Sequence, residues 1–315
     1  MKNNMVKKLL TLALAGAMTL SLAACGSKSD DSSNDVQQGG DESGKTYKVA
    51  IIKQLDHASL DEIANAVAAE LDKIAADNNV TIEYDITSGQ NDQTILKQLS
   101  DQAIADQVDA IIPIATTAAQ ISALSAEDTK TPVVYAAVSD PEAASLTGID
   151  YVTGTSDALP VEAQLKLIRA LMPDATKIGI LHTTSETNSD ATLALYKELA
   201  PNYGFEIIDK GISTGADLPM ALDALLPQVD CTTNLTDNTV VSYLAVVLEK
   251  SEEYGKPVFG SEIEQVINGC VASEGIEYTE LGRQTGRMAA RVLRGESAED
   301  IPYETISNSY LYVNP

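Results

Sequence analysis

Short runs of β-branched residues alternate with stretches of helical periodicity along most of this chain, and that alternation limits its fold to very few architectures. Residues 59–76 show the helical pattern, with apolar side chains every three or four residues, and residues 160–172 and 279–295 are further helices bounded by proline or glycine. Strands that alternate with helices of this length form parallel sheets covered on both faces. The predicted strands are residues 48–52, 80–85, 110–114, 133–137, 177–181, 206–211, 229–233, 257–260 and 269–273.

The alternation is interrupted once, and the interruption divides the chain into two parts. The strand–helix unit occurs four times, is broken at residues 147–157, and then restarts for five more strands. Because the two parts are similar in size, we predict an α/β fold of two doubly wound parallel-sheet lobes joined by a hinge. Such sheets place ligand loops at the carboxyl ends of their strands. Two lobes facing each other would enclose a ligand cleft, which is a favoured place for a small-molecule site.

The first 24 residues have the pattern of a secretory signal peptide. A basic start and an apolar stretch at residues 9–22 are followed by small residues that lead into Cys25. The sequence Leu-Ala-Ala-Cys at residues 22–25 resembles the lipobox of bacterial lipoproteins, which implies that Cys25 becomes the lipid-bearing mature N-terminus. An ordinary secretory signal with an incidental cysteine is the alternative. Residues 25–45 have the composition of a disordered tether, so we expect a globular part that begins near residue 46 and lies outside the cell membrane.

The chain is strongly acidic. Its 315 residues include 21 Lys and Arg against 46 Asp and Glu, a formal charge of −25 that becomes −28 when residues 1–24 and their three lysines are removed. Binding to nucleic acid needs clustered basic side chains, so this balance argues against nucleic acid as a partner. It argues equally against attachment to an anionic membrane through basic patches. The acidic surplus serves the solubility of an exposed surface.

The sequence contains no catalytic or nucleotide-binding motif. No Gly-x-Gly-x-x-Gly follows the first strand, and the chain has no Walker loop and no Gly-x-Ser-x-Gly elbow. His182 with Ser185 or Ser189 would imitate a hydrolase pair, but this loop offers no orienting partner. The two histidines, His57 and His182, have no Cys or His partners at metal-binding spacing. We therefore expect no enzyme, no cofactor and no metal.

Cys231 and Cys270 are the cysteines that remain after Cys25. Both fall on predicted strands of the second lobe with one strand between them. Strands are about 4.8 Å apart, so the two cysteines would lie about 10 Å apart, which is beyond disulfide reach. We favour two buried free thiols over a disulfide.

Polar side chains follow the predicted strands. Thr116 and Thr117 open a helix after the third strand, where free backbone N–H groups and two hydroxyls suit a carboxylate; a simple helix cap is the alternative. Asp237 follows a strand of the second lobe and is our candidate for an ammonium partner, with an N-cap as the alternative. Glu262, after the next strand, is its rival, or else a solvated loop residue.

Two further residues lie near the predicted cleft. His57 follows the first strand and is interpreted mainly as a residue of the loop or cleft rim, with ligand contact as the alternative. Tyr278 precedes a helix and either walls the cleft or lies at the surface or hinge.

The ligand is narrowed by what the predicted loops lack. All five arginines lie on predicted helices, whereas a phosphate or dicarboxylate ligand usually requires an arginine fork. Sugar sites commonly stack rings on tryptophan, and this chain has none. A zwitterion with a neutral side chain needs a cluster of donors, one carboxylate and an apolar hole, and the loops supply these. The five arginines are Arg169, Arg283, Arg287, Arg291 and Arg294.

A set of motifs stands out along the chain: Val-Thr-Gly-Thr-Ser-Asp at 152–157 with Pro-Val-Glu-Ala-Gln-Leu at 160–165, Thr-Asp-Asn-Thr-Val-Val at 236–241, Tyr-Thr-Glu-Leu-Gly-Arg-Gln-Thr-Gly at 278–286, and shorter segments at 56–61 and 115–120. These motifs resemble those of ABC transporter substrate-binding proteins whose characterised members bind tryptophan and other aromatic amino acids. The resemblance covers the chain from about Tyr47 to its end. It departs from the family at residues 182–186, which are more polar than usual, and a cleft without an aromatic side chain would weaken the case for an indole.

The resemblance implies a type I periplasmic-binding fold with three crossings between lobes. Lobe one would comprise residues 46–153 and about 278–296, and lobe two residues 154–277 and about 297–315. The ligand contacts it implies are Thr116, Thr117, Ser156, Asp157, Asn188, Ser189 and Asp237.

The expected function is that of a lipid-anchored, extracellular solute-binding protein of an ABC importer. It would capture an aromatic or other neutral amino acid by hinge closure, as a monomer, and deliver it to a membrane permease. The alternatives are a nucleoside, a peptide-like molecule or a signalling ligand. A surface enzyme and a chemoreceptor-type sensor without transport are rivals of a different class.

Overall fold

The computed structural model describes residues 44–306 and 308–314. The signal peptide expected at residues 1–24, the lipidation site Cys25 and nearly all of the predicted tether lie outside these residues. The described residues belong to one compact unit. Within this part of the chain, no helix has the length and apolar character needed to cross a membrane.

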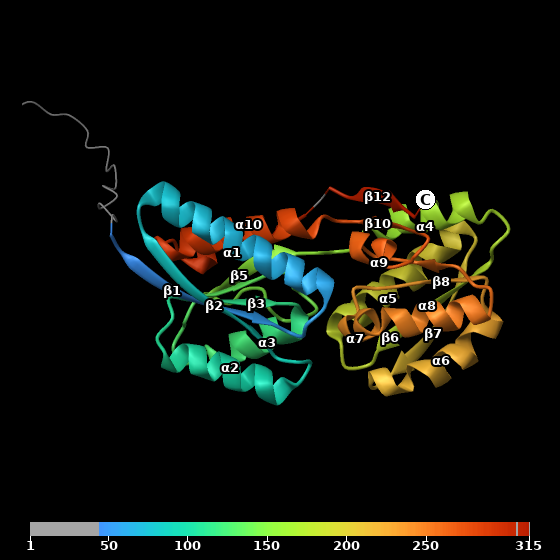
Figure 1. The fold of residues 1–315 in the computed structure, drawn as a ribbon, viewed down its shortest axis with the longest axis horizontal. Helices are drawn as coiled ribbons and strands as arrows, with labels where there is room; N and C mark the ends of the chain where they lie inside the picture. The colour runs from blue at the N-terminus through green and yellow to red at the C-terminus, as the bar shows by residue number, and fades with distance from the viewer. Residues whose placement is uncertain (1–43, 307, 315) are drawn as a thin grey trace, which may run out of the picture. The chain divides into compact units, whose positions relative to one another are not determined.

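A six-stranded parallel sheet forms the first lobe, in the strand order β11-β5-β4-β3-β1-β2 (Figure 1). Its parallel pairing is the arrangement that the strand–helix alternation predicts. The strands are β1 (Thr46–Lys53), β2 (Thr81–Ser88), β3 (Ala110–Ile114), β4 (Val133–Tyr135), β5 (Val152–Ser156) and β11 (Glu304–Thr305). The helices are α1 (Ala58–Asn78), α2 (Gln93–Ala105), α3 (Thr116–Ser125) and α10 (Tyr278–Leu293), with the 3-10 helix η4 (Ala298–Asp300).

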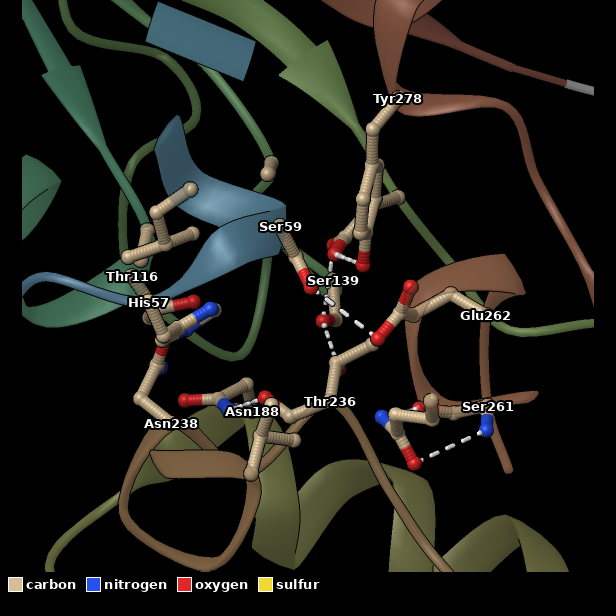
Figure 2. Close-up of a pocket in the computed structure, with 16 residues that line it drawn as sticks. His57, Ser59, Thr116, Ser139, Asn188, Thr236, Asn238, Ser261, Glu262 and Tyr278 are labelled. Atoms are coloured by element: carbon tan, nitrogen blue, oxygen red, sulfur yellow. Dashed lines mark hydrogen bonds between the residues drawn. The ribbon is translucent and has the colours of Figure 1, made fainter. Parts of the chain in front are cut away.

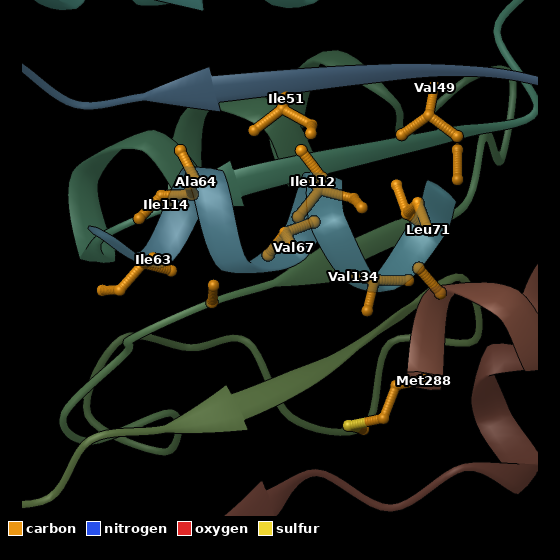
Figure 3. Close-up of a cluster of buried hydrophobic side chains, with 14 of the residues drawn as sticks. Val49, Ile51, Ile63, Ala64, Val67, Leu71, Ile112, Ile114, Val134 and Met288 are labelled. Carbon is orange, nitrogen blue, oxygen red and sulfur yellow. The ribbon is translucent and has the colours of Figure 1, made fainter. Parts of the chain in front are cut away.

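Helices cover both faces of this sheet. Neighbouring residues of a strand point to opposite sides, so one strand supplies apolar side chains to both faces. Ile51 belongs to a buried cluster with Val67 of α1 and Met288 of α10 (Figure 3). Ile52, the next residue of β1, belongs instead to a cluster with Leu96 of α2 and with α3. Both faces are therefore apolar, and polar side chains are left to the strand ends.

Helix α1 forms where its apolar spacing predicts, and Ser59 and Glu62, which have the spacing of a capping box, do not form one. His57 is the N-cap residue and makes no side-chain cap hydrogen bond. The Ser59 hydroxyl donates to Glu262 instead, at 3.0 Å. Glu62 accepts from the backbone N–H of Thr279 at 2.9 Å and from its hydroxyl at 2.6 Å. Both side chains thus bind other segments rather than their own helix.

The second lobe contains a four-stranded parallel sheet in the order β7-β6-β8-β9 and an antiparallel pair, β10 and β12. The strands are β6 (Lys177–Thr183), β7 (Glu206–Ile212), β8 (Cys231–Thr233), β9 (Val258–Phe259), β10 (Ala272–Gly275) and β12 (Tyr310–Val313). The helices are α4 (Val161–Leu171), α5 (Thr187–Leu199), α6 (Leu218–Leu225), α7 (Asn238–Ser242), α8 (Leu244–Glu253) and α9 (Ile263–Ile267), with the 3-10 helices η1 (Ala200–Tyr203), η2 (Gly215–Asp217) and η3 (Leu226–Gln228).

Cys231 and Cys270 are both buried and free. They belong to different apolar clusters, Cys231 to the one beneath α4 and α5 and Cys270 to the one beneath α6 and α8. Burial raises the pKa of each thiol to about 12, so both remain protonated at neutral pH.

The chain passes between the two lobes three times: after β5, before α10, and between β11 and β12. β5 extends to Ser156, so the boundary expected after residue 153 falls inside this strand. β11 pairs with β5 in the first sheet, so the last crossing comes later than the expected residue 297. A two-residue strand such as β11 carries too little pattern to be found in the sequence.

Candidate functional site

A narrow pocket, with a cavity volume of about 20 Å³, lies where the carboxyl ends of first-sheet strands meet loops of the second lobe (Figure 2). This space is enough for about one water molecule, so a larger ligand requires the lining groups to move apart. The first lobe contributes residues that follow β1, β3, β4 and β5. The second lobe contributes residues at the starts of α5, α7 and α9, and α10 contributes its first residue.

The pocket brings together predicted site residues that are far apart in the sequence: His57, Thr116, Asp157, Asn188, Glu262 and Tyr278. The remaining predicted contacts do not line it: Thr117, Ser156, Ser189 and Asp237. The prediction did not name these polar lining residues as contacts: Ser59, Ser139, Thr236, Asn238, Ser261 and Gln265. Three of the six follow strands and three belong to the first turn of a helix. A search of the sequence for polar residues at these two kinds of position would identify them.

The start of α3 faces the pocket without a cap. Ala115, the residue before the helix, has φ of 79° and provides no side-chain cap. Thr116, at the first helical position, is buried and lines the pocket. The N–H of Thr117 donates to Gln54 Oε1 at 3.2 Å, and Thr117 lines a different cavity. An uncapped helix start concentrates free N–H groups and positive dipole, so it suits an anion.

Asp157 is a buried carboxyl at the end of β5. It accepts a hydrogen bond from Ser139 Oγ at 2.8 Å and another from the Tyr278 hydroxyl at 3.3 Å. Ser156 stands beside it and donates to the Ser139 carbonyl at 3.2 Å, so Ser156 supports the site from outside the pocket. Burial raises the pKa of Asp157, and the two hydrogen bonds lower it less. A cationic group in the pocket would relieve this cost.

Glu262 is a second buried carboxyl of the same pocket. It caps α9 by accepting from the N–H of Glu264 at 2.7 Å, and it accepts from Ser59 Oγ of α1 at 3.0 Å. A Cβ at Gly275 would lie 2.8 Å from Glu262 Cα, so β10 passes directly against this loop. Burial raises the pKa of Glu262 to about 7.

His57 is neutral at physiological pH. Burial lowers its pKa to about 4, although the nearby Asn238 side chain raises it in part. Neither ring nitrogen makes a hydrogen bond of normal geometry to any residue among 44–306 and 308–314. A neutral imidazole with free ring nitrogens offers one donor and one acceptor to a ligand.

Asp237 lies outside the pocket, and its oxygens are already taken. It is fully buried and caps α7 by accepting from the N–H of Val240 at 2.9 Å. It also accepts from the N–H of Thr183 at 2.6 Å, the hydroxyl of Thr183 at 2.8 Å and the hydroxyl of Ser189 at 2.7 Å. These bonds fasten α7 and α5 to the end of β6, which is a structural role.

Glu186 positions two asparagines that line the pocket. Its oxygens accept from Asn188 Nδ2 at 3.2 Å, from the N–H and Nδ2 of Asn238 at 2.9 Å each, and from the N–H and hydroxyl of Thr239 at 3.0 and 2.9 Å. Burial raises the pKa of Glu186, and the charge of Asp237 adds to that increase. Glu186 does not line the pocket, but it holds in place the two asparagines, Asn188 and Asn238, that do.

A two-lobed α/β fold with a polar pocket at its strand ends defines a ligand-binding protein of the periplasmic-binding-protein type. The chain belongs to the family of ABC transporter substrate binding proteins, whose model matches residues 48–315. Proteins of this family bind ligands for transport and are not enzymes. Membership implies a small-molecule ligand and a permease partner.

The chain is similar to characterised proteins along most of its length. It is 31% identical to a tyrosine-binding protein of Clostridioides difficile over 313 residues, which are 98% of this chain and 90% of that protein. It is 28% identical to a Streptococcus pneumonia ABC domain solved in complex with L-Trp, with a TM-score of 0.79 over 84% of this chain and 91% of that one. It is 32% identical to a ligand-free, open substrate-binding protein from Clostridium difficile with adhesive properties, with a TM-score of 0.63 over 85% of this chain and 92% of that one.

Proposed function

We propose that this protein captures an aromatic or other neutral amino acid and delivers it to an ABC permease for import. One observation carries the proposal: a single pocket joins the uncapped start of α3, beside Thr116, to the buried carboxyl of Asp157. These are an anion site and a cation site, the two sites that a zwitterion needs. No lysine or arginine of the described chain lines this pocket, so the α3 start is its site for the ligand carboxylate.

The spacing of the two sites fits an α-amino acid. The first site follows β3 and the second follows β5, with β4 between them in the sheet. Strand spacing puts these ends about 10 Å apart. Two hydrogen bonds of about 3 Å each, with the ammonium and carboxylate of one α-carbon between them, span that distance. We therefore assign the ammonium to Asp157 in place of Asp237, whose oxygens are satisfied within the fold.

The rest of the pocket suits an apolar side chain. Leu60, Val241 and the ring of Tyr278 line it beside the polar groups. The relatives support an aromatic ligand, since one is a tyrosine-binding protein and another was solved with L-Trp. The pocket has no tryptophan or phenylalanine of its own, so Tyr278 is its aromatic surface.

Ligand capture would proceed by closure of the two lobes. Among the described residues, hydrogen bonds that join the lobes include Ser59 to Glu262 at 3.0 Å, Asn91 to Thr239 at 3.1 Å, and Ser139 to Thr236 at 3.0 Å. The TM-score of this structure is higher against the L-Trp complex (0.79) than against the ligand-free, open protein (0.63), at similar sequence identity. A ligand that contacts both lobes favours the closed population.

We propose that the protein works on the outer face of the cell membrane as a monomer. Removal of residues 1–24 and lipidation of Cys25 would anchor it, and residues 25–45 would let the lobes reach the permease. Expression of the full chain and of its Cys25→Ser variant tests this. The native chain should remain with the membrane fraction and the variant should appear in the medium; equal distribution would contradict the anchor.

A ligand panel tests the proposed function. The thermal-unfolding midpoint of the purified protein should rise with the concentration of an aromatic amino acid, because binding to the folded state alone stabilises it. Since the chain has no tryptophan, indole emission reports L-tryptophan directly, and its anisotropy should increase on binding. If no aromatic or branched amino acid raises the midpoint while a nucleoside or peptide does, the proposed ligand class is wrong.

A further inference from the structure

The pocket contains more buried acid than an amino acid's ammonium requires. Asp157 and Glu262 are each about 2% exposed, and both line the pocket. A zwitterionic ligand brings one ammonium, so one carboxyl is left without a cationic partner. A buried carboxylate that lacks further donors is costly, and a ligand donor would reduce that cost.

The two carboxyls lie in different parts of the pocket. A second, open groove with a cavity volume of about 340 Å³ adjoins the pocket, and the two cavities share one wall. Glu262 belongs to this shared wall, whereas Asp157 lines the inner pocket and not the groove. Ser59, whose hydroxyl is bonded to Glu262, is also part of the wall (Figure 2). The residues common to both cavities are His57, Ser59, Val241, Glu262 and Gln265.

The α-carbon of the ligand belongs at the inner end. Asp157 and the α3 start both follow strands of the first sheet, and they take the ammonium and the carboxylate. Glu262 comes from the second lobe and lines the pocket together with the apolar groups of Leu60 and Val241. An aromatic ring that lies against these groups would direct its far edge toward the shared wall.

Glu262 has acceptor capacity left for such a ligand. A carboxylate has about four acceptor positions, and Ser59, the N–H of Glu264 and the side chain of Gln265 occupy at most three of them. Resting on the proposed function, we infer that Glu262 is a specificity-determining residue that accepts a hydrogen bond from an O–H or N–H on the far edge of an aromatic ligand. The ligand class is thereby narrowed to aromatic amino acids with a side-chain donor, such as a phenol or an indole, in preference to hydrocarbon side chains.

Matched ligand pairs test this inference. L-tyrosine and L-phenylalanine differ by one hydroxyl, and L-tryptophan and 3-benzothienyl-L-alanine differ by one N–H at nearly constant shape. Above the pKa of Glu262, a hydrogen bond to its charged carboxylate corresponds to a preference of about 10- to 100-fold for the member that carries the donor. Titration calorimetry on the purified protein measures the preference within each pair.

Two variants place the preference on Glu262. Glu262→Leu removes every acceptor and should reduce the preference to about 1, whereas Glu262→Gln keeps one acceptor oxygen and should retain part of it. Binding of L-phenylalanine within a few-fold of the native value shows that the variant pocket is intact. Glu264→Leu, the same change on the groove side of α9, should leave the preference unchanged.

The outcomes separate this inference from the proposed function. Equal native affinities within both pairs, or an undiminished preference in both Glu262 variants, would overturn the role of Glu262 while amino-acid binding still stands. If Glu262→Leu binds none of the ligands, the test depends on the affinity ratio within each pair in Glu262→Gln. A reduced ratio supports the role of Glu262, and an undiminished ratio contradicts it. Failure of the native protein to bind any of the four ligands would overturn the proposed function and this inference with it.

Discussion

The side-chain amide of Asn91 donates a hydrogen bond of 3.1 Å to the hydroxyl of Thr239, joining the loop after β2 to the start of α7. Asn91 also accepts from Gln54 Nε2 at 3.0 Å, and the Thr239 hydroxyl donates to Glu186 at 2.9 Å. Glu186 in turn holds Asn188, which lines the pocket. A bond between the lobes is thereby continuous with the side chains that would surround a ligand.

Removal of the Asn91 side chain should weaken ligand binding without weakening the fold. Asn91→Gly loses the bond between lobes, and a neutral hydrogen bond of about 1 kcal/mol corresponds to about fivefold in Kd. We expect the change mainly in the dissociation rate, measured by stopped-flow, because the bond holds the closed arrangement.

A matched variant separates this effect from the backbone. Gln90 and Asn91 have φ of 52° and 58°, so glycine relieves a similar strain at either position. Gln90→Gly should therefore leave the dissociation rate unchanged. If both glycine variants accelerate dissociation equally, the loop backbone rather than the Asn91–Thr239 bond is responsible.

Asp157→Asn should lower affinity while leaving stability nearly unchanged. Loss of the charge that we assign to the ligand ammonium should raise Kd about 10- to 100-fold for every α-amino acid that binds. Burial raises the pKa of Asp157, so the neutral amide avoids a desolvation cost that offsets its poorer bonding to Ser139 or Tyr278. Calorimetry and urea unfolding measure the two quantities. Asp140→Asn, one residue beyond Ser139 and outside the pocket, is the control and should change neither.

Asp237→Asn should have the opposite profile. The side-chain NH2 of asparagine cannot accept the two bonds that Asp237 Oδ2 takes from the Thr183 N–H and the Ser189 hydroxyl, so we expect a loss of about 2–3 kcal/mol in the free energy of unfolding. When binding is measured on the folded fraction of the variant, Asp237→Asn should raise Kd less than Asp157→Asn does. Unchanged stability with a large loss of affinity would restore Asp237 as the ammonium partner.

The fold could be predicted from the sequence because its long elements carry local patterns. The apolar spacing of α1 and the buried run of β3 are each sufficient to identify an element. The two-residue β11 and the five-residue α7 and α9 each span fewer than two periods of their pattern. Their places depend on the packing of distant segments, so the last crossing between lobes could not be located from the sequence.

The site could be predicted less completely, because side-chain direction is set by contacts far away in the sequence. Thr116 and Thr117 are adjacent and identical, but a helix turns by about 100° per residue, so only the first faces the pocket. Asp157 and Asp237 both lie between a strand and a helix. Asp237 accepts a hydrogen bond from the hydroxyl of Thr183, which is 54 residues away in the sequence. The local sequence does not reveal this pairing.

The ligand-free protein should show two opposing pH effects on stability, one from Glu262 and one from His57. The pKa of Glu262 rises from 4.5 to about 7 on folding, so the folded state retains a proton that the unfolded state releases. Stability should therefore fall by roughly 3 kcal/mol as pH rises from about 4.5 to about 7. The pKa of His57 falls from 6.5 to about 4, so its contribution is present above pH 6.5 and is lost as pH falls toward 4.

Single variants should separate the two effects. Urea unfolding of Glu262→Gln, compared with the native protein, should show a relative stability that increases with pH through about 4.5 to 7, because the variant does not suffer the cost of a buried charge. His57→Asn should show relative stability that increases as pH falls through about 6.5 to 4. Other ionisable groups lie near each residue, Glu264 and Tyr278 by Glu262, and Lys53, Asp56 and Asp61 by His57. Glu264→Gln is therefore the control for Glu262→Gln, and Asp56→Asn is the control for His57→Asn. If the relative stability of a control depends on pH as strongly as that of its test variant, the neighbouring group is responsible for the effect.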